Sequence, residues 1–267
     1  MPAELIQLHT SDGLTHSGAF YPPQGNTKEL GVIFVHGMTG SFVGEIESVV
    51  PGLIALAGYA TLCANNRGYG YKGAATEEFA GCIPDIRAAI DFMEERGYSR
   101  IALIGHSKGG VKVAYYLTQT QDERVAMLGL LSPADNVHGI PYWVTPLIGK
   151  NDVESFMEEL DTVIESGQEE KMYILPEWPY FISARTLLDH YRTRDDDVLP
   201  QIPGFKLPLL AVCGGQETDW CTTVTMLQKT PPANARVLII PEADHVYTGK
   251  EMILAQVIID WLGGSNS

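Results

Sequence analysis

The segment GHSKGG, residues 105–110, constrains the fold of this chain more than any other. The apolar run RIALI precedes it, and VKVAYYL, a pattern typical of a helix, follows at once. A serine between a strand and a helix, with a glycine two residues away on either side, is typical of a turn too sharp for side chains. Such a turn exposes the serine hydroxyl in strained backbone geometry. Ser107 is therefore predicted to be a catalytic residue. The alternative is a glycine-rich turn that contains a serine without a catalytic role.

Strand-like and helix-like patterns alternate over most of the chain. Short apolar runs that end at glycine, such as LGVIFVHG (residues 30–37) and LPLLAVCGG (residues 207–215), indicate buried parallel strands. Helical patterns lie between such runs, and in the last of them, residues 251–264, apolar side chains cover a wide face. Repeated strand–helix units predict an α/β fold in which helices cover both faces of a mostly parallel sheet.

Residues 136–204 break this alternation. The chain therefore divides into a core, residues 1–135 and 205–267, and an insertion. Residues 151–200 hold 13 acidic and 4 basic side chains, and the segment LPEWPYF within them contains two prolines and three aromatic residues. Long insertions in compact domains are usually functional, so we expect a cap or lid over the edge of the sheet. The alternative is a surface excursion without a role in binding.

Charge and patterning disfavour several classes of partner. With 33 acidic and 18 basic residues the formal net charge is -15, which argues against nucleic acids and anionic membranes. Residues 1–13 show neither the basic nor the apolar region of a signal peptide. No apolar run reaches the roughly 18 residues of a membrane span. We expect a cytoplasmic protein, a monomer or homodimer, that binds a small-molecule substrate.

The cysteines are Cys63, Cys82, Cys213 and Cys221. None belongs to a CxxC motif or to a Cys/His cluster, so we expect no metal site. Free thiols in the cytoplasm are the favoured interpretation. The alternative is a bond between Cys213 and Cys221, which flank one loop, in an oxidising compartment.

A serine nucleophile needs a base and an acid that orients the base. His245, in the segment PEADHVYTG, follows the last predicted strand and precedes the last predicted helix. This position places it at the same edge of the sheet as Ser107, so His245 is predicted to be the base. The histidines that fit this position less well are His9, His16, His36, His106, His138 and His190.

The orienting acid has two candidates in the segment GGQETDWC. The spacing Gly-x-x-acid, counted from Gly214, ends at Glu217, whereas Asp219 requires a loop that is two residues longer. Aspartate is the commoner residue in this role, but glutamate also serves. The candidate that is not used is expected to be a solvated loop residue, or a helix cap in the case of Asp219. The sequence leaves both open.

Two backbone amides are candidates for stabilising a developing oxyanion. Lys108 follows Ser107 at the predicted start of a helix, where backbone N–H groups favour negative charge. The segment HGMTG follows the strand of residues 30–37 and places the Met38 N–H as a second donor. Gly37 is expected to allow close approach of this loop to the substrate. The alternative for HGMTG is an ordinary turn at the end of a strand.

Several motifs follow one another along the chain in this order: HGMTG, NNRGYG, GHSKGG, an acid after the penultimate long strand, and ADH after the last strand. With these motifs the sequence resembles the α/β-hydrolase superfamily, and in particular its serine esterases and lipases. The resemblance implies an α/β-hydrolase fold with a mostly parallel eight-stranded sheet, and no cofactor. Many members carry D-x-R-G-x-G in place of NNRGYG, so that Asn65 replaces an aspartate while Arg67, Gly68 and Gly70 match.

The resemblance implies hydrolysis of a carboxylic ester through an acyl-enzyme on Ser107. The same machinery serves thioesterases, lactonases and hydrolases of C–C bonds, and some relatives are ligand receptors. A serine nucleophile argues against haloalkane dehalogenase and epoxide hydrolase chemistry. The insertion carries the aromatic residues Tyr142, Trp143, Trp178, Tyr180 and Phe181. With Gly37, we expect Trp143, Trp178 and Tyr180 to line a site for an apolar or aromatic group. The alternative is that these rings form the core of the cap.

Overall fold

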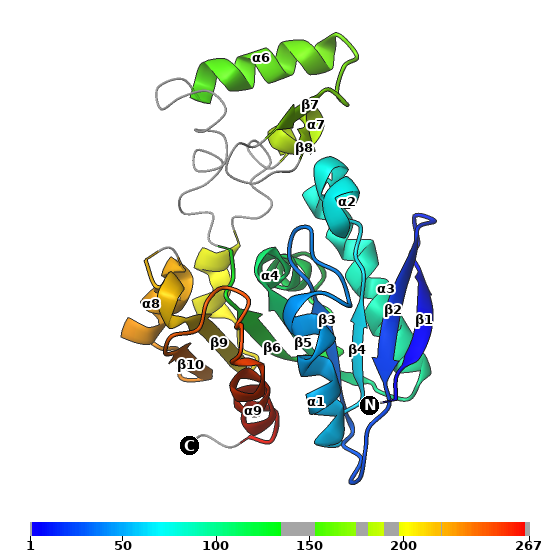
Figure 1. The fold of residues 1–267 in the computed structure, drawn as a ribbon, viewed down its shortest axis with the longest axis vertical. Helices are drawn as coiled ribbons and strands as arrows, with labels where there is room; N and C mark the ends of the chain where they lie inside the picture. Colours follow the sequence, from blue (N-terminus) through cyan, green and yellow to red (C-terminus); the bar gives the residue numbers. More distant parts are fainter. Residues whose placement is uncertain (1, 135–152, 175–180, 190–197, 220, 265–267) are drawn as a thin grey trace.

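The computed structural model describes residues 2–134, 153–174, 181–189, 198–219 and 221–264. These residues form an eight-stranded sheet in the order β1-β2-β4-β3-β5-β6-β9-β10 (Figure 1). The strands are β1 (Glu4–His9), β2 (Thr15–Tyr21), β3 (Leu30–Val35), β4 (Thr61–Ala64), β5 (Arg100–His106), β6 (Val125–Leu131), β9 (Leu209–Gly214) and β10 (Ala235–Ile240). Strand β2 pairs antiparallel with both β1 and β4, and the other pairings are parallel. The prediction of a mostly parallel eight-stranded sheet is thereby confirmed.

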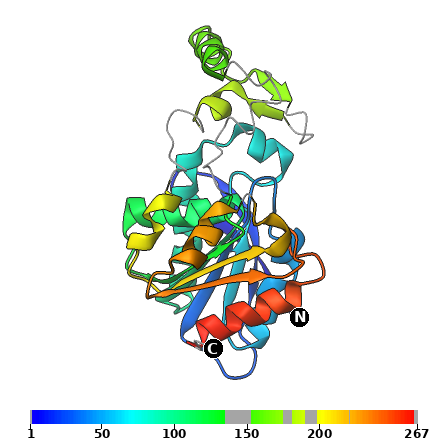
Figure 2. The same ribbon diagram turned by 90° about the vertical axis from the view of Figure 1, so that its left-hand side faces the viewer.

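Helices cover both faces of the sheet, as the strand–helix alternation predicts (Figure 2). On one face lie α3 (Cys82–Glu95), α4 (Lys108–Thr120) and α8 (Thr222–Lys229). On the other face lie α1 (Val50–Leu56) and α9 (Glu251–Leu262). Shorter elements connect these layers: η1 (Glu45–Ser48), α2 (Gly70–Thr76), η2 (Phe79–Gly81), η5 (Leu199–Gly204) and η6 (Gly215–Glu217).

The central strand β5 shows why its sequence is an unbroken apolar run. Ile101 and Leu103 belong to the core beneath α3 and α4, whereas Ala102 and Ile104 belong to the core beneath α1 and α9. Successive side chains of a strand point to opposite faces, so a strand covered on both faces needs apolar residues at every position. The carboxyl end of β5 is therefore firmly anchored where the GHSKGG turn begins.

The described part of residues 136–204 has its own small core. Helix α6 (Val153–Glu165), strands β7 (Met172–Ile174) and β8 (Phe181–Ser183) and helix α7 (Ala184–Leu188) lie at the end of the molecule beyond α2 (Figure 1). Their buried apolar side chains are Phe156, Met157, Leu160, Ile182, Ala184 and Leu187, which we call the insertion cluster. Strands β7 and β8 have three residues each, too short for the sequence to show their alternation.

Several contacts join this unit to the rest of the molecule, among them an ion pair between Arg185 and Glu78 at 3.4 Å. The backbone N–H of Phe79 in η2 donates a 2.7 Å hydrogen bond to Asp189, which follows α7. The side chain of Met38, in the loop after β3, packs against the insertion cluster. The insertion therefore touches the loop that the sequence analysis singles out for oxyanion binding.

Two further expectations concern membranes and disulfides. In the parts of the chain that the structure describes, no helix combines the length and apolar character needed to cross a bilayer. All four cysteines lie within those parts and are buried, and no disulfide joins them. Cys221 Sγ instead lies 3.9 Å from the Pro133 carbonyl oxygen.

Candidate active site

Ser107 occupies a strained turn between β5 and α4. Its backbone angles are φ 56 and ψ -126, a region that a residue with a side chain rarely adopts and that costs about 1–3 kcal/mol. A Cβ atom at Gly105 would lie 2.1 Å from the Gly109 carbonyl oxygen, and one at Gly109 would lie 2.0 Å from the Val35 carbonyl oxygen. Both glycines are therefore required by lack of space, as the GHSKGG motif predicts.

His245 lies beside Ser107, in the loop between β10 and α9. Its Nε2 is 2.9 Å from Ser107 Oγ, and its Nδ1 is 2.8 Å from Glu217 Oε2. Because an ionised carboxylate only accepts hydrogen bonds, Nδ1 carries the proton and Nε2 is left to accept from the serine hydroxyl. The His245 side chain stays 28% exposed, so a substrate can reach it.

Glu217 is the acid that reaches His245. It ends the short helix η6, directly after β9, and is buried. Its Oε1 accepts hydrogen bonds from the Ser132 hydroxyl and, at 2.7 Å, from the Gly214 N–H. Burial alone would raise the pKa of Glu217, but the hydrogen bonds from His245, Ser132 and Gly214 together lower it below its usual value. Asp219 is exposed, and among the described contacts none joins it to His245.

Ser132 and Tyr247 support Glu217, and no sequence motif marks either of them. The Tyr247 hydroxyl lies 2.8 Å from Ser132 Oγ and 3.3 Å from the Val212 carbonyl oxygen. Both residues are fully buried and have positive φ angles, 43 for Ser132 and 57 for Tyr247. Burial raises the pKa of Tyr247 well above its usual value, so its hydroxyl stays neutral. The carboxylate thus bonds to the Ser132 hydroxyl, which in turn contacts a neutral Tyr247 hydroxyl.

The loop after β3 lies directly against Ser107. A Cβ atom at Gly37 would lie 2.7 Å from the Cβ of Ser107 and 3.1 Å from its Oγ. Met38 follows Gly37, and Lys108 is the first residue of α4. The structure therefore brings the two segments that carry the predicted amide donors to the Ser107 hydroxyl.

A chain of buried hydrogen bonds holds this loop in place. His36 Nδ1 donates to the Gly37 carbonyl oxygen at 2.8 Å, and His36 Nε2 accepts from the Asn66 N–H at 3.1 Å. Asn66 Oδ1 accepts from Lys112 Nζ at 3.1 Å, and Lys112 forms a fully buried ion pair with Glu77. Burial, reinforced by the Lys112 charge, lowers the pKa of His36 to about 4, so this ring is neutral. The helix that follows Ser107 is thereby linked to the loop that faces it.

The NNRGYG segment connects neighbouring parts of the fold. Asn65 Oδ1 accepts a 3.1 Å hydrogen bond from the Phe42 N–H, so asparagine here holds the loop after β3. Arg67 forms ion pairs with Asp85 at 2.9 Å and with Asp12 at 2.8 Å. Asp85 also lies 3.0 Å from His16 Nε2. These contacts tie β2, α3 and the loop after β4 together.

The predicted aromatic site residues Trp143, Trp178 and Tyr180 lie outside the described residues, as does Tyr142. Phe181 is described, in β8, where its side chain is exposed. The arrangement of these rings around a substrate therefore stays a prediction.

Known proteins share this architecture. A family model described as the alpha/beta hydrolase fold matches residues 32–159. Est1E from Butyrivibrio proteoclasticus, in a structure with bound ferulic acid, aligns with a TM-score of 0.74 at 19% identity, covering 97% of this chain and 98% of that chain. A carboxyl esterase from Bacillus coagulans aligns with a TM-score of 0.70 at 12% identity, covering 99% of each chain. No curated protein sequence matches the chain. The chain therefore has the α/β-hydrolase fold.

Proposed function

We propose that this protein is a serine hydrolase that cleaves a carboxylic ester through an acyl-enzyme. The observation that carries the proposal is the continuous hydrogen-bonded chain from Ser107 Oγ through His245 to Glu217, with contacts of 2.9 and 2.8 Å. Nucleophile, base and orienting acid in this order form the constellation that activates a serine hydroxyl. Glu217 takes the role of the acid in this proposal, because the described contacts of His245 lead to it and not to Asp219.

In the first half of the reaction, the Ser107 oxygen attacks the carbonyl carbon while His245 Nε2 takes the hydroxyl proton. The carbonyl π electrons move to the oxygen, where the backbone N–H groups of Met38 and Lys108 stabilise the negative charge. Glu217 stabilises the imidazolium that forms. His245 then gives the proton to the departing alcohol oxygen, the C–O bond breaks, and the acyl group stays on Ser107.

In the second half, water attacks the acyl-enzyme. His245 takes a proton from the water, and the same two amides hold the second oxyanion. Collapse breaks the bond to the Ser107 oxygen, which recovers its proton from His245, and the carboxylic acid leaves. The atoms balance without a metal or an organic cofactor.

Structural neighbours that are esterases favour an ester over the other bonds that this machinery can cleave. These include an esterase domain from a Rhodothermus marinus protein and the carboxyl esterase from Bacillus coagulans. The Est1E neighbour holds ferulic acid, an aromatic acid, which agrees with the aromatic residues predicted for the insertion. We therefore propose a small or medium substrate with an apolar or aromatic group. Thioesters, lactones and C–C bonds beside a ketone are the alternatives.

We further propose that residues 136–204 form a cap over this site. The packing of Met38 against the insertion cluster supports the proposal, because Met38 belongs to the loop that lies against Ser107. A cap that touches the oxyanion loop excludes water from the reacting carbonyl and shapes the space for the acyl or alcohol group.

The test is active-site labelling followed by a substrate panel. A fluorophosphonate probe is expected to label the wild-type protein at Ser107 and to leave Ser107→Ala unlabelled; labelling of the variant would overturn the assignment. Esters, thioesters and lactones of varied acyl length, hydroxycinnamate esters included, then identify the bond and the acyl group. Many turnovers per molecule are expected, whereas near-stoichiometric hydrolysis would instead indicate a receptor that kept the hydrolase residues.

A further inference from the structure

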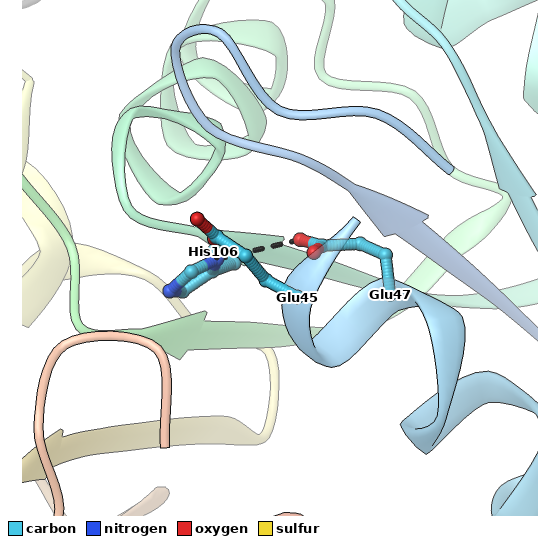
Figure 3. Close-up of side chains that lie close together, drawn as sticks. All are labelled: Glu45, Glu47 and His106. Carbon is cyan, nitrogen blue, oxygen red and sulfur yellow. Dashed lines mark ion pairs between the residues drawn. The ribbon is translucent and has the colours of Figure 1, made fainter. Parts of the chain in front are cut away.

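His106, the residue before Ser107, lies buried between two hydrogen-bond acceptors. Its Nε2 is 2.9 Å from the carbonyl oxygen of His245, and its Nδ1 is 3.3 Å from Oε1 of Glu47. Glu47 comes from η1 and faces the His106 ring (Figure 3). Its side chain is 2% exposed. The proposed catalytic base is thus connected, through its own backbone, to a buried carboxylate that the acyl-transfer mechanism does not use.

The acceptors determine where the protons on His106 reside. A carbonyl oxygen only accepts, so His106 Nε2 must carry a hydrogen. If the ring were neutral, the lone pair on Nδ1 would then face the Glu47 carboxylate. A ring protonated on both nitrogens donates to the His245 carbonyl oxygen and replaces this repulsion with an attraction between opposite charges.

The buried carboxylate of Glu47 is in turn stabilised by a positive charge on His106. Its Oε1 is buried, and the described residues offer it no conventional hydrogen bond. A buried carboxylate is costly without a counterion, and the His106 ring is the group in contact with it. A positive charge on His106 therefore satisfies the carboxylate and the carbonyl oxygen together.

The groups around the ring agree with this assignment. Glu45 and Glu47 face it from η1, and the rings of His245 and Tyr247 face it at centroid distances of 5.2 and 6.3 Å. Burial alone would lower the pKa of His106, but Glu47, the His245 carbonyl oxygen and Glu45 raise it above its usual value.

We propose that Glu47 and protonated His106 form a buried charge pair that positions His245, so that His106 is a positioning residue for the catalytic base. This inference rests on the proposed hydrolase function. Glu217 and Ser107 fix the two nitrogens of the His245 ring, and His106 fixes the backbone that carries the ring. The charge matters because a hydrogen bond from a charged donor is about twice as strong as one between neutral groups.

A divalent cation is the competing occupant of this cluster. Donor atoms of Glu45, Glu47 and His106 all lie within 4.8 Å of one another, and a histidine that gives its second N–H to a carbonyl is a common metal ligand. The proton is favoured because Glu45 is half-exposed, at 3.9 Å from Nδ1, whereas the contact with Glu47 is closer and buried.

Nitrogen NMR of the wild-type protein, labelled with ¹⁵N-histidine, tests the charge directly. The His106 signals are assigned by their loss in His106→Gln. Both nitrogens are expected to show the shifts of a doubly protonated ring at pH 7, and to do so after treatment with EDTA. A neutral ring at pH 7 would overturn the proposal, and so would a metal-bound shift that appears on addition of Zn²⁺ together with a gain in activity.

Kinetics of Glu47→Gln test the positioning role, with Glu45→Gln as the matched control on the same short helix. In Glu47→Gln we expect kcat to fall about 10- to 100-fold with KM nearly unchanged, because a misplaced base slows chemistry and not binding. Glu45→Gln should stay within about twofold of wild type. Equal kcat values for the two variants would overturn the proposal. Fluorophosphonate labelling of the wild-type protein separates this result from failure of the hydrolase assignment. If Glu47→Gln does not fold, the wild-type NMR result decides.

Discussion

The carboxylate of Glu217 lies 2.8 Å from Nδ1 of His245, and it does so because η6 begins directly after β9. The Gly214 N–H, at the end of that strand, bonds to the other carboxylate oxygen at 2.7 Å. This local bond bends the glutamate side chain back toward the strand end, where the Ser132 hydroxyl also reaches it. A short turn thus selects the nearer of two acids, while Asp219 is exposed.

Glu217→Gln should lower kcat by about 10⁴, because an amide can neither hold the Nδ1–H tautomer nor stabilise the imidazolium. Asp219→Asn is the matched control and should keep kcat within about twofold of wild type. Steady-state kinetics on any ester that the substrate panel identifies measure both. A large loss in Asp219→Asn with a mild effect in Glu217→Gln would reverse the assignment of the acid.

Gly37→Ala should slow the reaction without unfolding the protein. The added methyl group would lie 2.7 Å from Ser107 Cβ, so the loop or the serine must shift by several tenths of an ångström. Displacements of this size in a reacting group cost about 10- to 100-fold in kcat.

Gly204→Ala provides the control for this substitution. None of the residues that the structure describes lies within 4 Å of a Cβ atom at Gly204, and Gly204 is exposed. Activity and thermal midpoint of this variant should match wild type. If Gly37→Ala kept full kcat, the close contact between the loop and the nucleophile would not matter for catalysis.

Lys112→Met should destabilise the fold by about 3–5 kcal/mol, because it leaves the Glu77 carboxylate buried without its partner. The double variant Lys112→Met/Glu77→Gln should lose much less than the sum of the two single losses, since it removes both charges. Urea unfolding of the four proteins completes the thermodynamic cycle. Additive losses would show that the two side chains are not energetically coupled.

Asp85 provides a pH-dependent part of the stability. Burial alone would raise its pKa, but hydrogen bonds from His16 and Arg67 lower it to about 2, against an ordinary value of 3.8. A carboxyl whose pKa is lowered by folding stabilises the protein above its unfolded pKa. That stability is lost as pH falls toward the folded pKa. The difference corresponds to about 2 kcal/mol.

The variant Asp85→Asn tests the pH range over which the stabilisation by Asp85 is lost. Compared with wild type, its deficit in free energy of unfolding should be constant from pH 7 to about 5 and should shrink as pH falls from about 4 toward 2. Denaturant titrations at several pH values measure the difference in free energy of unfolding between the two proteins. The effects of carboxyl groups that both proteins share cancel in this difference. A deficit that grows on acidification would contradict the sign.

The fold and the serine–histidine pair are well predicted from sequence because each depends on local patterns. Apolar runs buried on both faces reveal the parallel strands, and lack of space at Gly105 and Gly109 forces a recognisable motif around Ser107. His245 is found from its place between the last strand and the last helix. The acid is harder, since two carboxylates occupy one loop and a spacing alone does not tell which side chain turns inward.

Ser132, Tyr247 and Glu47 were not predicted at all. Each contacts the site through a neighbour distant in sequence, and none lies in a pattern that marks its role. Ser132 follows an ordinary apolar strand, and Glu47 reads as one more acidic residue of a short helix. Their importance comes from burial beside a specific polar partner, which sequence spacing does not encode.

The sequence by itself determined the layered architecture, the strained turn that presents Ser107, and the edge of the sheet at which His245 meets it. These follow from side-chain periodicity and from the conformational freedom of glycine, which act over a few residues. Only the tertiary structure decided that Glu217 contacts His245, and that His106 contacts both the His245 carbonyl oxygen and Glu47. Such choices depend on which polar atoms come within about 3 Å after the strands and helices pack, and on the cost of burying a charge that finds no partner.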